Sequence, residues 1–447
     1  MIDDTISAIA TANGIGSIAI IRISGAKALE IVKRLSKRES FPPRHATLTN
    51  IYDVDKTLID EAIVIYFEAP YSFTAEHVVE IQCHGGFVVA QSILKATLEA
   101  GARVANAGEF SKRAFLNGRI DLSEAEAIAQ LIEAKSEDAA KILASQMKGS
   151  LKHFVEEVRD DLLHILAFSE VSIDYAEEDL PEDLLLQIKA KLEELHKLLR
   201  RTLQASKSRE GLMQGFRVAI IGKPNVGKSS LLNALLNFDR AIVSDIAGTT
   251  RDTVEEQVKI GSHVIRMVDT AGIREAKDDI ERIGIERSLE AIKESDIVVA
   301  LFDSSRVADD EDREIVRLVE LSRQENKDVL VVKNKIDLEE KFSLDTLAFD
   351  IELNSKDNVT SLIKALENMM NRSNHSDEIM LISTRQISAV KQTMKSIEES
   401  FMPLEDQELE LFSFHLNEAV KEMTAITRPF ENDEMLEKMF GSFCLGK

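Results

Sequence analysis

The sequence has little cysteine, no long apolar run and no excess of positive charge. Only two of its 447 residues are cysteine, which excludes a disulfide framework and indicates a reducing compartment. No apolar run approaches the roughly 20 residues that a membrane-spanning helix needs, so we expect no membrane partner. The first residues, MIDDTISAIA, lack the basic-then-apolar pattern of a signal peptide. Together these absences predict a cytoplasmic protein.

The charge balance is strongly acidic. Lys and Arg number 55, Asp and Glu number 78, and the formal net charge is −23. Broad binding of nucleic acid depends on neutralising phosphates with basic side chains, so this chain is a poor candidate for it. If the protein acts on RNA, we expect a partner to provide much of the RNA binding.

The length predicts several domains, and three kinds of sequence pattern follow one another. Residues 1–120 mix strand-like runs (SIAIIRISG, AIVIYF, HVVEIQCHGG) with helical runs, which predicts an α+β domain. Residues 121–210 have apolar residues at helical spacing. Residues 216–372 alternate strand and helix, and residues 373–447 return to helix. The economical interpretation is a discontinuous helical bundle interrupted by an inserted α/β domain.

Two local patterns predict where particular elements begin or turn. Ser123 and Glu126 have the spacing of a capping box, which predicts the start of the first long helix. Gly261 and Ser262 separate the runs TVEEQVKI and HVIRMVD, which predicts a hairpin with a tight turn.

The segment GKPNVGKSS, residues 222–230, matches the phosphate-loop motif G-x-x-x-x-G-K-[ST]. It follows the strand-like run RVAII and precedes the helical run SLLNALLN, which is the context that the motif requires. Gly222 and Gly227 let backbone N–H groups approach the phosphates, and Lys228 reaches the β- and γ-phosphate oxygens. The hydroxyl of Ser229 is the expected Mg²⁺ ligand.

Two later segments complete the expected metal shell. SDIAGTTRD, residues 244–252, offers Thr250 as a second Mg²⁺ ligand. DTAG, residues 269–272, ends a strand-like run, where Asp269 would support the metal from beside the phosphate loop. In this order after a phosphate loop, DTAG is better explained by nucleotide binding than by an ordinary turn.

The run VLVVKNKID predicts the base. The carboxylate of Asp337 can accept from N1–H and N2–H₂ of guanine, a donor pair that adenine lacks, while Asn334 and Lys335 shape the pocket. The four segments together predict a GTPase. The residues expected to bind the nucleotide are Asn225, Val226, Gly227, Lys228, Ser229, Ser230, Ser244, Asp245, Ile246, Ala247, Gly248, Thr249, Thr250, Asp269, Thr270, Ala271, Gly272, Asn334, Lys335 and Asp337.

The usual water-orienting residue is missing. Many GTPases have a glutamine after the DTAG-type motif, but this chain has Ile273, which can neither donate nor accept a hydrogen bond. Glu281 could orient the water instead, although on the residues alone a solvent-exposed helix charge is the better interpretation. Arg251 is a further candidate for the catalytic set.

A GTPase pattern inside a helical bundle, behind an α+β domain and ahead of a C-terminal FCLGK, resembles the MnmE family, also called TrmE, of tRNA-modification GTPases. The resemblance spans essentially the whole chain, and its most specific motifs are DTISAIAT, RISG, GEFSKRAFLNGRIDLSEAEA, AGTTRD and FCLGK. It implies a folate-binding dimerisation domain ahead of the bundle and a Ras-like GTPase domain within it. The chain departs from the family pattern at His77, Ala107 and Arg428.

For catalysis, the resemblance implies GTPase domains that dimerise across their nucleotides and use K⁺ where other GTPases use an arginine finger. Asn225, Ser244, Ile246 and Thr249 correspond to the K⁺-binding positions, the last two mainly through backbone carbonyls. A cation placed there could offset transition-state charge. Glu281 falls on the family's water-orienting glutamate, which favours the catalytic interpretation over a surface charge.

For folate, the resemblance implies a site for 5-formyl- or 5,10-methylene-tetrahydrofolate in the N-terminal domain. Arg22, Glu80, Arg119 and the terminal Lys447 match its contact positions. In the family the tail lies beside this site, so we expect Cys444 to be a reactive thiol. A buried structural thiol is the alternative for Cys444.

The implied function is carried out with the flavoprotein MnmG (GidA), which would contribute FAD and bind much of the tRNA. The pair, a homodimer of this chain in a heterotetramer with MnmG, would install an aminomethyl or carboxymethylaminomethyl group at C5 of the wobble uridine of certain tRNAs. The alternative is a GTP-dependent switch in ribosome assembly without modification chemistry. Such a switch should carry a basic RNA-binding appendage, whereas the regions that flank the GTPase segments here are acidic bundle and α+β domain.

Overall fold

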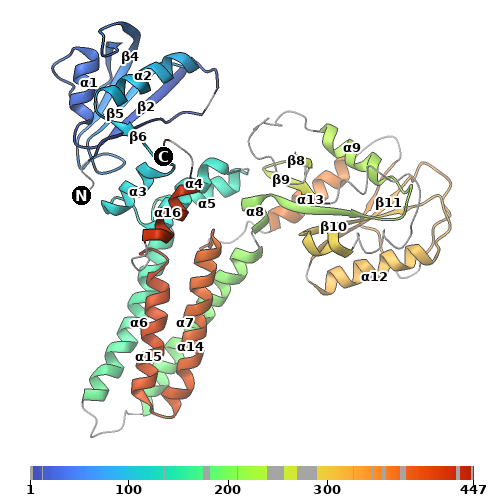
Figure 1. Ribbon diagram of the computed structural model, residues 1–447. Helices are drawn as coiled ribbons and strands as arrows, with labels where there is room; N and C mark the ends of the chain where they lie inside the picture. Colours follow the sequence, from blue (N-terminus) through green and yellow to red (C-terminus); the bar gives the residue numbers. More distant parts are fainter. Residues whose placement is uncertain are drawn as a thin grey trace. The chain divides into compact units, whose positions relative to one another are not determined.

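The structure is a computed structural model (Figure 1). It describes residues 4–12, 14–134, 136–174, 182–208, 210–238, 256–268, 289–325, 327–344, 347–354, 359–372, 379–428, 433–443 and 446. The chain divides into two compact units. The first comprises Met1–Gln130, Gln146–Leu192 and Gln392–Lys447, and the second comprises Leu131–Ser145 and Glu193–Lys391. Within the described ranges, no helix is long and apolar enough to cross a bilayer.

The N-terminal part of the first unit is an α+β fold built on a six-stranded sheet of order β3-β4-β5-β2-β1-β6. All neighbours are antiparallel except β1 and β6. Helices α1 and α2 lie over one face of this sheet (Figure 1) and bury Ile31, Val32 and Ile93 against Ile21 and Ile81. The elements are β1 (Ile6–Ile9), β2 (Ile18–Ser24), α1 (Ala28–Ser36), β3 (Thr47–Tyr52), β4 (Leu58–Phe67), β5 (Val78–His84), α2 (Phe87–Glu99), β6 (Arg103–Val104) and α3 (Glu109–Leu116).

The helical part of the first unit is built from segments far apart in the sequence, as the discontinuous bundle predicts. Helices α6 and α15 pack along each other, and the hydroxyls of Ser169 and Ser413 lie 2.8 Å apart within that contact. Lys189 of α7 pairs with Glu405 of α14. The helices are α4 (Leu122–Glu133), α6 (Ser150–Asp174), α7 (Glu182–Ser208), α14 (Thr384–Glu405), α15 (Leu409–Thr424) and α16 (Asp433–Gly441), of which α4, α7 and α14 continue into the second unit.

The predicted capping box of the first long helix is wrong by two residues. Asp121 Oδ1 accepts hydrogen bonds from the Ser123 hydroxyl (2.7 Å) and the Glu124 amide (2.9 Å). Glu124 in turn accepts from the Asp121 amide at 2.7 Å. Asp is as good an N-cap as Ser, so the helix begins at Leu122 and Ser123 lies inside its first turn. Glu126 is buried in the same helix.

The second unit contains a six-stranded sheet of order β12-β11-β10-β7-β9-β8, parallel except for the β8–β9 hairpin. The hairpin turns at Gly261 and Ser262, as predicted, with Ile260 opposite His263. Strands β7, β10 and β11 are almost continuously apolar, which is typical of parallel strands buried on both faces. The elements are α5 (Glu137–Met147), which ends in the first unit, α8 (Glu210–Gln214), β7 (Phe216–Ile221), α9 (Lys228–Phe238), β8 (Glu256–Ile260), β9 (His263–Met267), β10 (Ile297–Asp303), α12 (Asp310–Gln324), β11 (Asp328–Asn334), β12 (Ile351–Glu352) and α13 (Thr360–Arg372).

Candidate functional site

The phosphate loop connects the end of β7 to the start of α9. A side chain at Gly222 would place Cβ 2.5 Å from the Leu301 carbonyl oxygen, and one at Gly227 would place it 2.5 Å from Asn334 Nδ2. Both glycines also have positive φ, +151° and +108°. No other residue type fits both the space and the backbone, so the motif glycines are required for this close approach.

Lys228 is the first residue of α9, and its side chain folds back over the loop. Its ammonium donates to the carbonyl oxygens of Gly222 at 2.6 Å and Lys223 at 2.8 Å. Burial lowers the pKa of Lys228, because these neutral carbonyls do not compensate the charge as an anion would. A half-buried cation at a helix N-terminus is suited to phosphate oxygens.

The predicted base-recognition residues meet the phosphate loop. Asn334 is buried at the end of β11 and donates from Nδ2 to the Val226 carbonyl at 2.8 Å. Lys335, with φ +62°, donates to the Asn225 carbonyl at 2.9 Å. The structure therefore joins the two predicted segments, 222–230 and 334–337, at one edge of the sheet. This is the carboxyl edge of the parallel strands, where α/β proteins bind ligands.

Asp303 belongs to this site, although the sequence analysis did not identify it. Its carboxylate accepts from Lys335 Nζ at 2.6 Å and from the Ser305 hydroxyl at 2.6 Å. Burial alone would raise the pKa of Asp303, but these hydrogen bonds outweigh it and the pKa lies below its usual value. Its position at the carboxyl end of a continuously apolar strand, IVVALFD, is a signal that could have revealed it.

Several predicted site residues lie outside the described part of the chain. These are Ser244, Asp245, Ile246, Ala247, Gly248, Thr249, Thr250, Arg251, Asp269, Thr270, Ala271, Gly272, Glu281, Cys444 and Lys447. Of the expected Mg²⁺ ligands, Ser229 alone is described, in the first turn of α9. When Mg²⁺ is bound, the Ser229 hydroxyl would be one of its ligands.

In the N-terminal sheet, the predicted folate residues Arg22 and Glu80 face each other across β2 and β5. Arg22 Nε and Nη2 both donate to Glu80 Oε1, at 3.0 and 2.8 Å. The guanidinium carbon lies 5.7 Å from the ring centroids of both Phe73 and Phe110. Both charged side chains keep some exposure, 21% for Arg22 and 17% for Glu80, so the pair is accessible from one side. Arg119 is exposed and follows α3.

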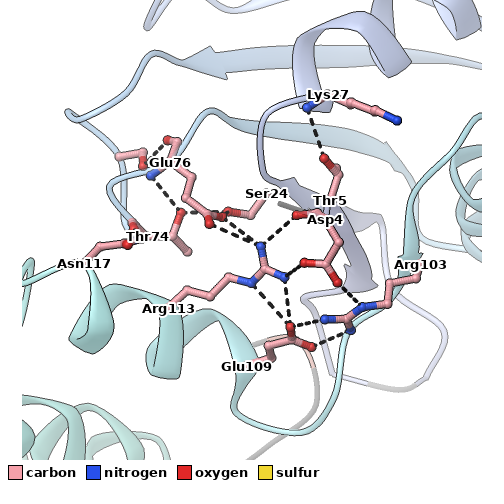
Figure 2. Close-up of polar contacts among 11 residues, drawn as sticks. Asp4, Thr5, Ser24, Lys27, Thr74, Glu76, Arg103, Glu109, Arg113 and Asn117 are labelled. Atoms are coloured by element: carbon pink, nitrogen blue, oxygen red, sulfur yellow. Dashed lines mark hydrogen bonds and ion pairs between the residues drawn. The ribbon is translucent and has the colours of Figure 1, made fainter. Parts of the chain in front are cut away.

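A buried network of charged groups holds α3 against the N-terminal segment (Figure 2). The Arg113 side chain is 1% exposed and pairs with Asp4, Glu76 and Glu109 at 2.6, 3.2 and 3.0 Å. Arg103 bridges Asp4 and Glu109 from the other side. Burial alone would lower the pKa of Arg113, but its carboxylate partners outweigh that effect and raise it. The network fixes the helix that carries Phe110, one of the two rings that flank Arg22.

The tail and one departure from the family pattern have visible structural roles. A Cβ built at Gly446 would lie 2.4 Å from the Ile9 carbonyl oxygen, so this tail residue lies against the end of β1. The neighbouring strand β2 carries Arg22. His77 accepts or donates at Nδ1 to the Tyr66 hydroxyl at 2.7 Å, so it tethers the loop before β5 to β4 and takes no visible part in the Arg22–Glu80 pair.

Comparison with known proteins decides the family. Residues 5–119 match the model described as GTP-binding protein TrmE N-terminus, and residues 122–444 match the MnmE helical domain. The chain belongs to the MnmE family of tRNA modification GTPases. As a member of the MnmE family it is a GTPase, which confirms the main prediction from the sequence.

Two MnmE relatives illustrate the extent of the similarity. The tRNA modification GTPase MnmE of Sulfurimonas denitrificans is 76% identical over 447 residues, which is all of both chains. The MnmE of Aliarcobacter butzleri is 57% identical over all of this chain and 99% of its own. A crystal structure of Era with MgGDPNP and 16S ribosomal RNA is 26% identical over 40% of this chain and 66% of its own. Its TM-score of 0.25 is too low to bear on the fold.

Proposed function

We propose that this GTPase, together with the flavoprotein MnmG, installs an aminomethyl or carboxymethylaminomethyl group at C5 of the wobble uridine of certain tRNAs. The observation that supports it most directly is the match to MnmE relatives over the full length of the chain. The acidic net charge of −23 supports a division of labour in which MnmG binds much of the tRNA and contributes FAD.

For the nucleotide site, we infer a task for each predicted residue. Lys228 and the N-terminus of α9 bind the β- and γ-phosphates, and Ser229 contributes to the Mg²⁺ shell with Thr250 and Asp269. Mg²⁺, when bound, neutralises charge that develops on the phosphate oxygens. Asp337 selects guanine, and the hydrogen bonds of Asn334 and Lys335 to the loop couple occupation of the base site to the shape of the phosphate site.

For hydrolysis, we infer that K⁺ is held by Asn225, Ser244, Ile246 and Thr249, and that Glu281 orients the attacking water. Asn225 supports this role in two ways. Its backbone is held in the left-handed region, with φ +64°, and its carbonyl already accepts from Lys335. Its side chain is exposed and is therefore free to reach a cation that arrives with the nucleotide.

The one-carbon donor is proposed to be a 5-formyl- or 5,10-methylene-tetrahydrofolate bound by Arg22, Glu80, Arg119 and Lys447. A cation and a carboxylate side by side match the donors and acceptors of a pterin and the carboxylates of a glutamate tail. The position of Gly446 against β1 supports a tail near this site, where Cys444 would act as a thiol in the modification.

At the level of the whole chain, we propose four segments. These are a folate-binding and dimerisation domain over 1–120, a helical domain over 121–210 and 373–447, and an inserted Ras-like GTPase domain over 216–372. The bundle would transmit joining and separation of two GTPase domains within a homodimer. A heterotetramer with MnmG would bring the tRNA to this dimer.

A reconstituted modification assay tests the proposal. The full-length protein is combined with MnmG, unmodified tRNA, GTP, NADH, methylene-tetrahydrofolate and an ammonium or glycine donor. The tRNA is then digested, and its nucleosides are analysed by mass spectrometry. We expect a C5-modified wobble uridine that disappears when GTP or folate is left out. GTP hydrolysis without any modified nucleoside, in the complete mixture, would favour the ribosome-assembly alternative.

A further inference from the structure

Lys223, the second residue of the phosphate loop, has a side chain that turns away from the loop and is bound elsewhere. Its ammonium contacts the carboxylates of Asp309 and Asp312, the latter at 3.1 Å. The Lys223 side chain is only 12% exposed and that of Asp312 only 6%. Burial alone would lower the pKa of Lys223, but the two acids outweigh it and raise the pKa. The contact with Asp312 is thus largely buried and charge-assisted, whereas the Asp309 side chain is 55% exposed.

The two acids are the capping residues of α12. Asp309 is the N-cap and accepts from the amides of Glu311 and Asp312 at 3.1 and 3.2 Å. Asp312 accepts from the Asp309 amide at 3.1 Å, which completes a reciprocal capping box. A helix start with both capping bonds formed is a rigid point of attachment. The Lys223 side chain is therefore fixed to it at two oxygens.

The backbone of the same lysine holds the phosphate-binding residue. The Lys223 carbonyl accepts from Lys228 Nζ at 2.8 Å. Lys223 therefore links two parts of the site: its side chain is bound to the start of α12, and its carbonyl accepts from the Lys228 ammonium that is expected to bind the phosphates. The loop, residues 222–228, includes two glycines, Gly222 and Gly227, and ordering it on binding costs conformational entropy unless it is already held.

We propose that Lys223 and the α12 capping pair Asp309 and Asp312 form a brace that pre-orders the phosphate loop for nucleotide binding. Lys223 is a positioning residue. Its ammonium is bound to α12, so it would act on the nucleotide only through the conformation of the loop backbone. Since bound phosphates organise the loop themselves, the brace should strengthen binding of GDP and GTP while leaving the rate at saturation nearly unchanged.

Three variants of the full-length protein test the brace from both sides. Lys223→Met removes the cation, Asp309→Asn/Asp312→Asn removes the acids while keeping oxygens that can cap the helix, and the third combines all three changes. Lys223→Arg is the conservative rescue. Arg313→Met is the matched control, because Arg313 pairs with Asp310 on the same first turn at 65% and 94% exposure and does not contact the loop.

The readouts are the Kd of fluorescent GDP and GTP analogues, and the KM and kcat of GTP hydrolysis. We expect Lys223→Met and the double Asn variant each to raise Kd and KM about three- to tenfold. The combined variant should have Kd and KM values similar to those of either single set of changes, because the groups act as one unit. Changes in kcat should stay within about twofold. Lys223→Arg should restore most of the affinity, and Arg313→Met should match wild type.

The proposal is overturned if the double Asn variant binds nucleotide like wild type, or if its effect multiplies with that of Lys223→Met. An equal loss of affinity in Arg313→Met would also overturn it, because the effect would then belong to α12 stability. The double Asn variant leaves the phosphate loop sequence intact, so it still decides the question if Lys223→Met fails to fold.

Discussion

Lys228 affects both the stability of the nucleotide-free protein and its affinity for nucleotide. Its side chain is half-buried, its two described partners are neutral carbonyls, and burial lowers its pKa. A buried charge without a counterion destabilises the folded protein, and a phosphate would remove that cost on binding. The same residue therefore reduces the stability of the empty site and increases its affinity for nucleotide.

Lys228→Met should separate these two effects. We expect nucleotide affinity to fall about 100-fold, in line with the loss of charge-assisted hydrogen bonds worth about 3 kcal/mol. The melting temperature of the nucleotide-free protein should stay the same or rise, because a buried charge has gone. Isothermal titration with GDP and thermal unfolding without nucleotide check this. A marked fall in melting temperature would mean that the bonds of Lys228 to the loop carbonyls outweigh its desolvation.

Asp337 should decide the choice of base. Asp337→Asn replaces one acceptor with a donor, which no longer matches guanine but matches xanthine, whose C2 carries an oxygen. We expect the affinity for GDP to fall and that for XDP to rise, reversing the preference by about 100-fold or more. Competition of GDP and XDP for a fluorescent nucleotide measures it. Glu339→Gln, two residues away and 82% exposed, is the control and should keep the preference for GDP.

Cys83 should be chemically silent. It is buried on β5, its thiol donates to the Ala19 carbonyl at 3.4 Å, and burial, with Asp60 nearby, raises its pKa to about 11. Thiolate is the reactive form, so iodoacetamide at pH 7.5 should leave Cys83 unmodified in the native protein and alkylate it in urea. Peptide mass spectrometry provides the readout. Rapid native alkylation of Cys83 would contradict the burial.

At the scale of elements, the sequence was most informative where structure is local. The strand and helix that flank the phosphate loop and the turn at Gly261 follow from periodicity and turn chemistry, and the structure confirms them. Strands β1 and β3 were not predicted, because each is short and depends on partners distant in sequence. The capping box was misplaced because Asp121 and Ser123 are equally good caps, and only the backbone shows which one is used.

The Arg113 network could not be predicted because, of the carboxylates that pair with Arg113, all but Glu109 lie at least 37 residues away along the chain. Within α3 alone, an arginine beside Lys112 would be taken for a surface charge. The structure instead buries it among three carboxylates (Figure 2). By the same reasoning, Asp303 became a site residue only when folding brought it to Lys335.

Breaking the Arg113 network should unfold the N-terminal sheet more readily. Arg113→Met removes the buried cation shared by Asp4, Glu76 and Glu109, although Arg103 still pairs with Asp4 and Glu109. Removal of one partner of a buried pair costs up to about 3–5 kcal/mol. We expect a lower urea midpoint for the transition of this part, followed by tyrosine fluorescence and circular dichroism. Lys95→Met, at an exposed helix pair with Glu99, is the matched control and should change stability by less than about 0.5 kcal/mol. Equal midpoints for the two variants would contradict a stabilising role.

At the scale of the whole molecule, the family could be recognised from the order of the segments along the chain. A phosphate loop alone would indicate a nucleotide-binding protein. The helical segments on both sides, the N-terminal motifs and the FCLGK tail together distinguish MnmE, and the two family models match residues 5–119 and 122–444. What the sequence could not supply is the contact between segments, such as Lys335 with Asn225 or Gly446 with β1, because these depend on folding.

We propose that hydrolysis in this GTPase uses K⁺ and Glu281 in place of an arginine finger and a glutamine. Steady-state GTP hydrolysis in KCl and in NaCl, at equal ionic strength, tests it most directly, with wild type, Glu281→Ala and the neighbouring control Glu286→Ala. We predict that K⁺ stimulates wild type and Glu286→Ala at least about tenfold and that Glu281→Ala loses the stimulated rate. Equal rates in both salts, or full K⁺ stimulation in Glu281→Ala, would contradict the claim.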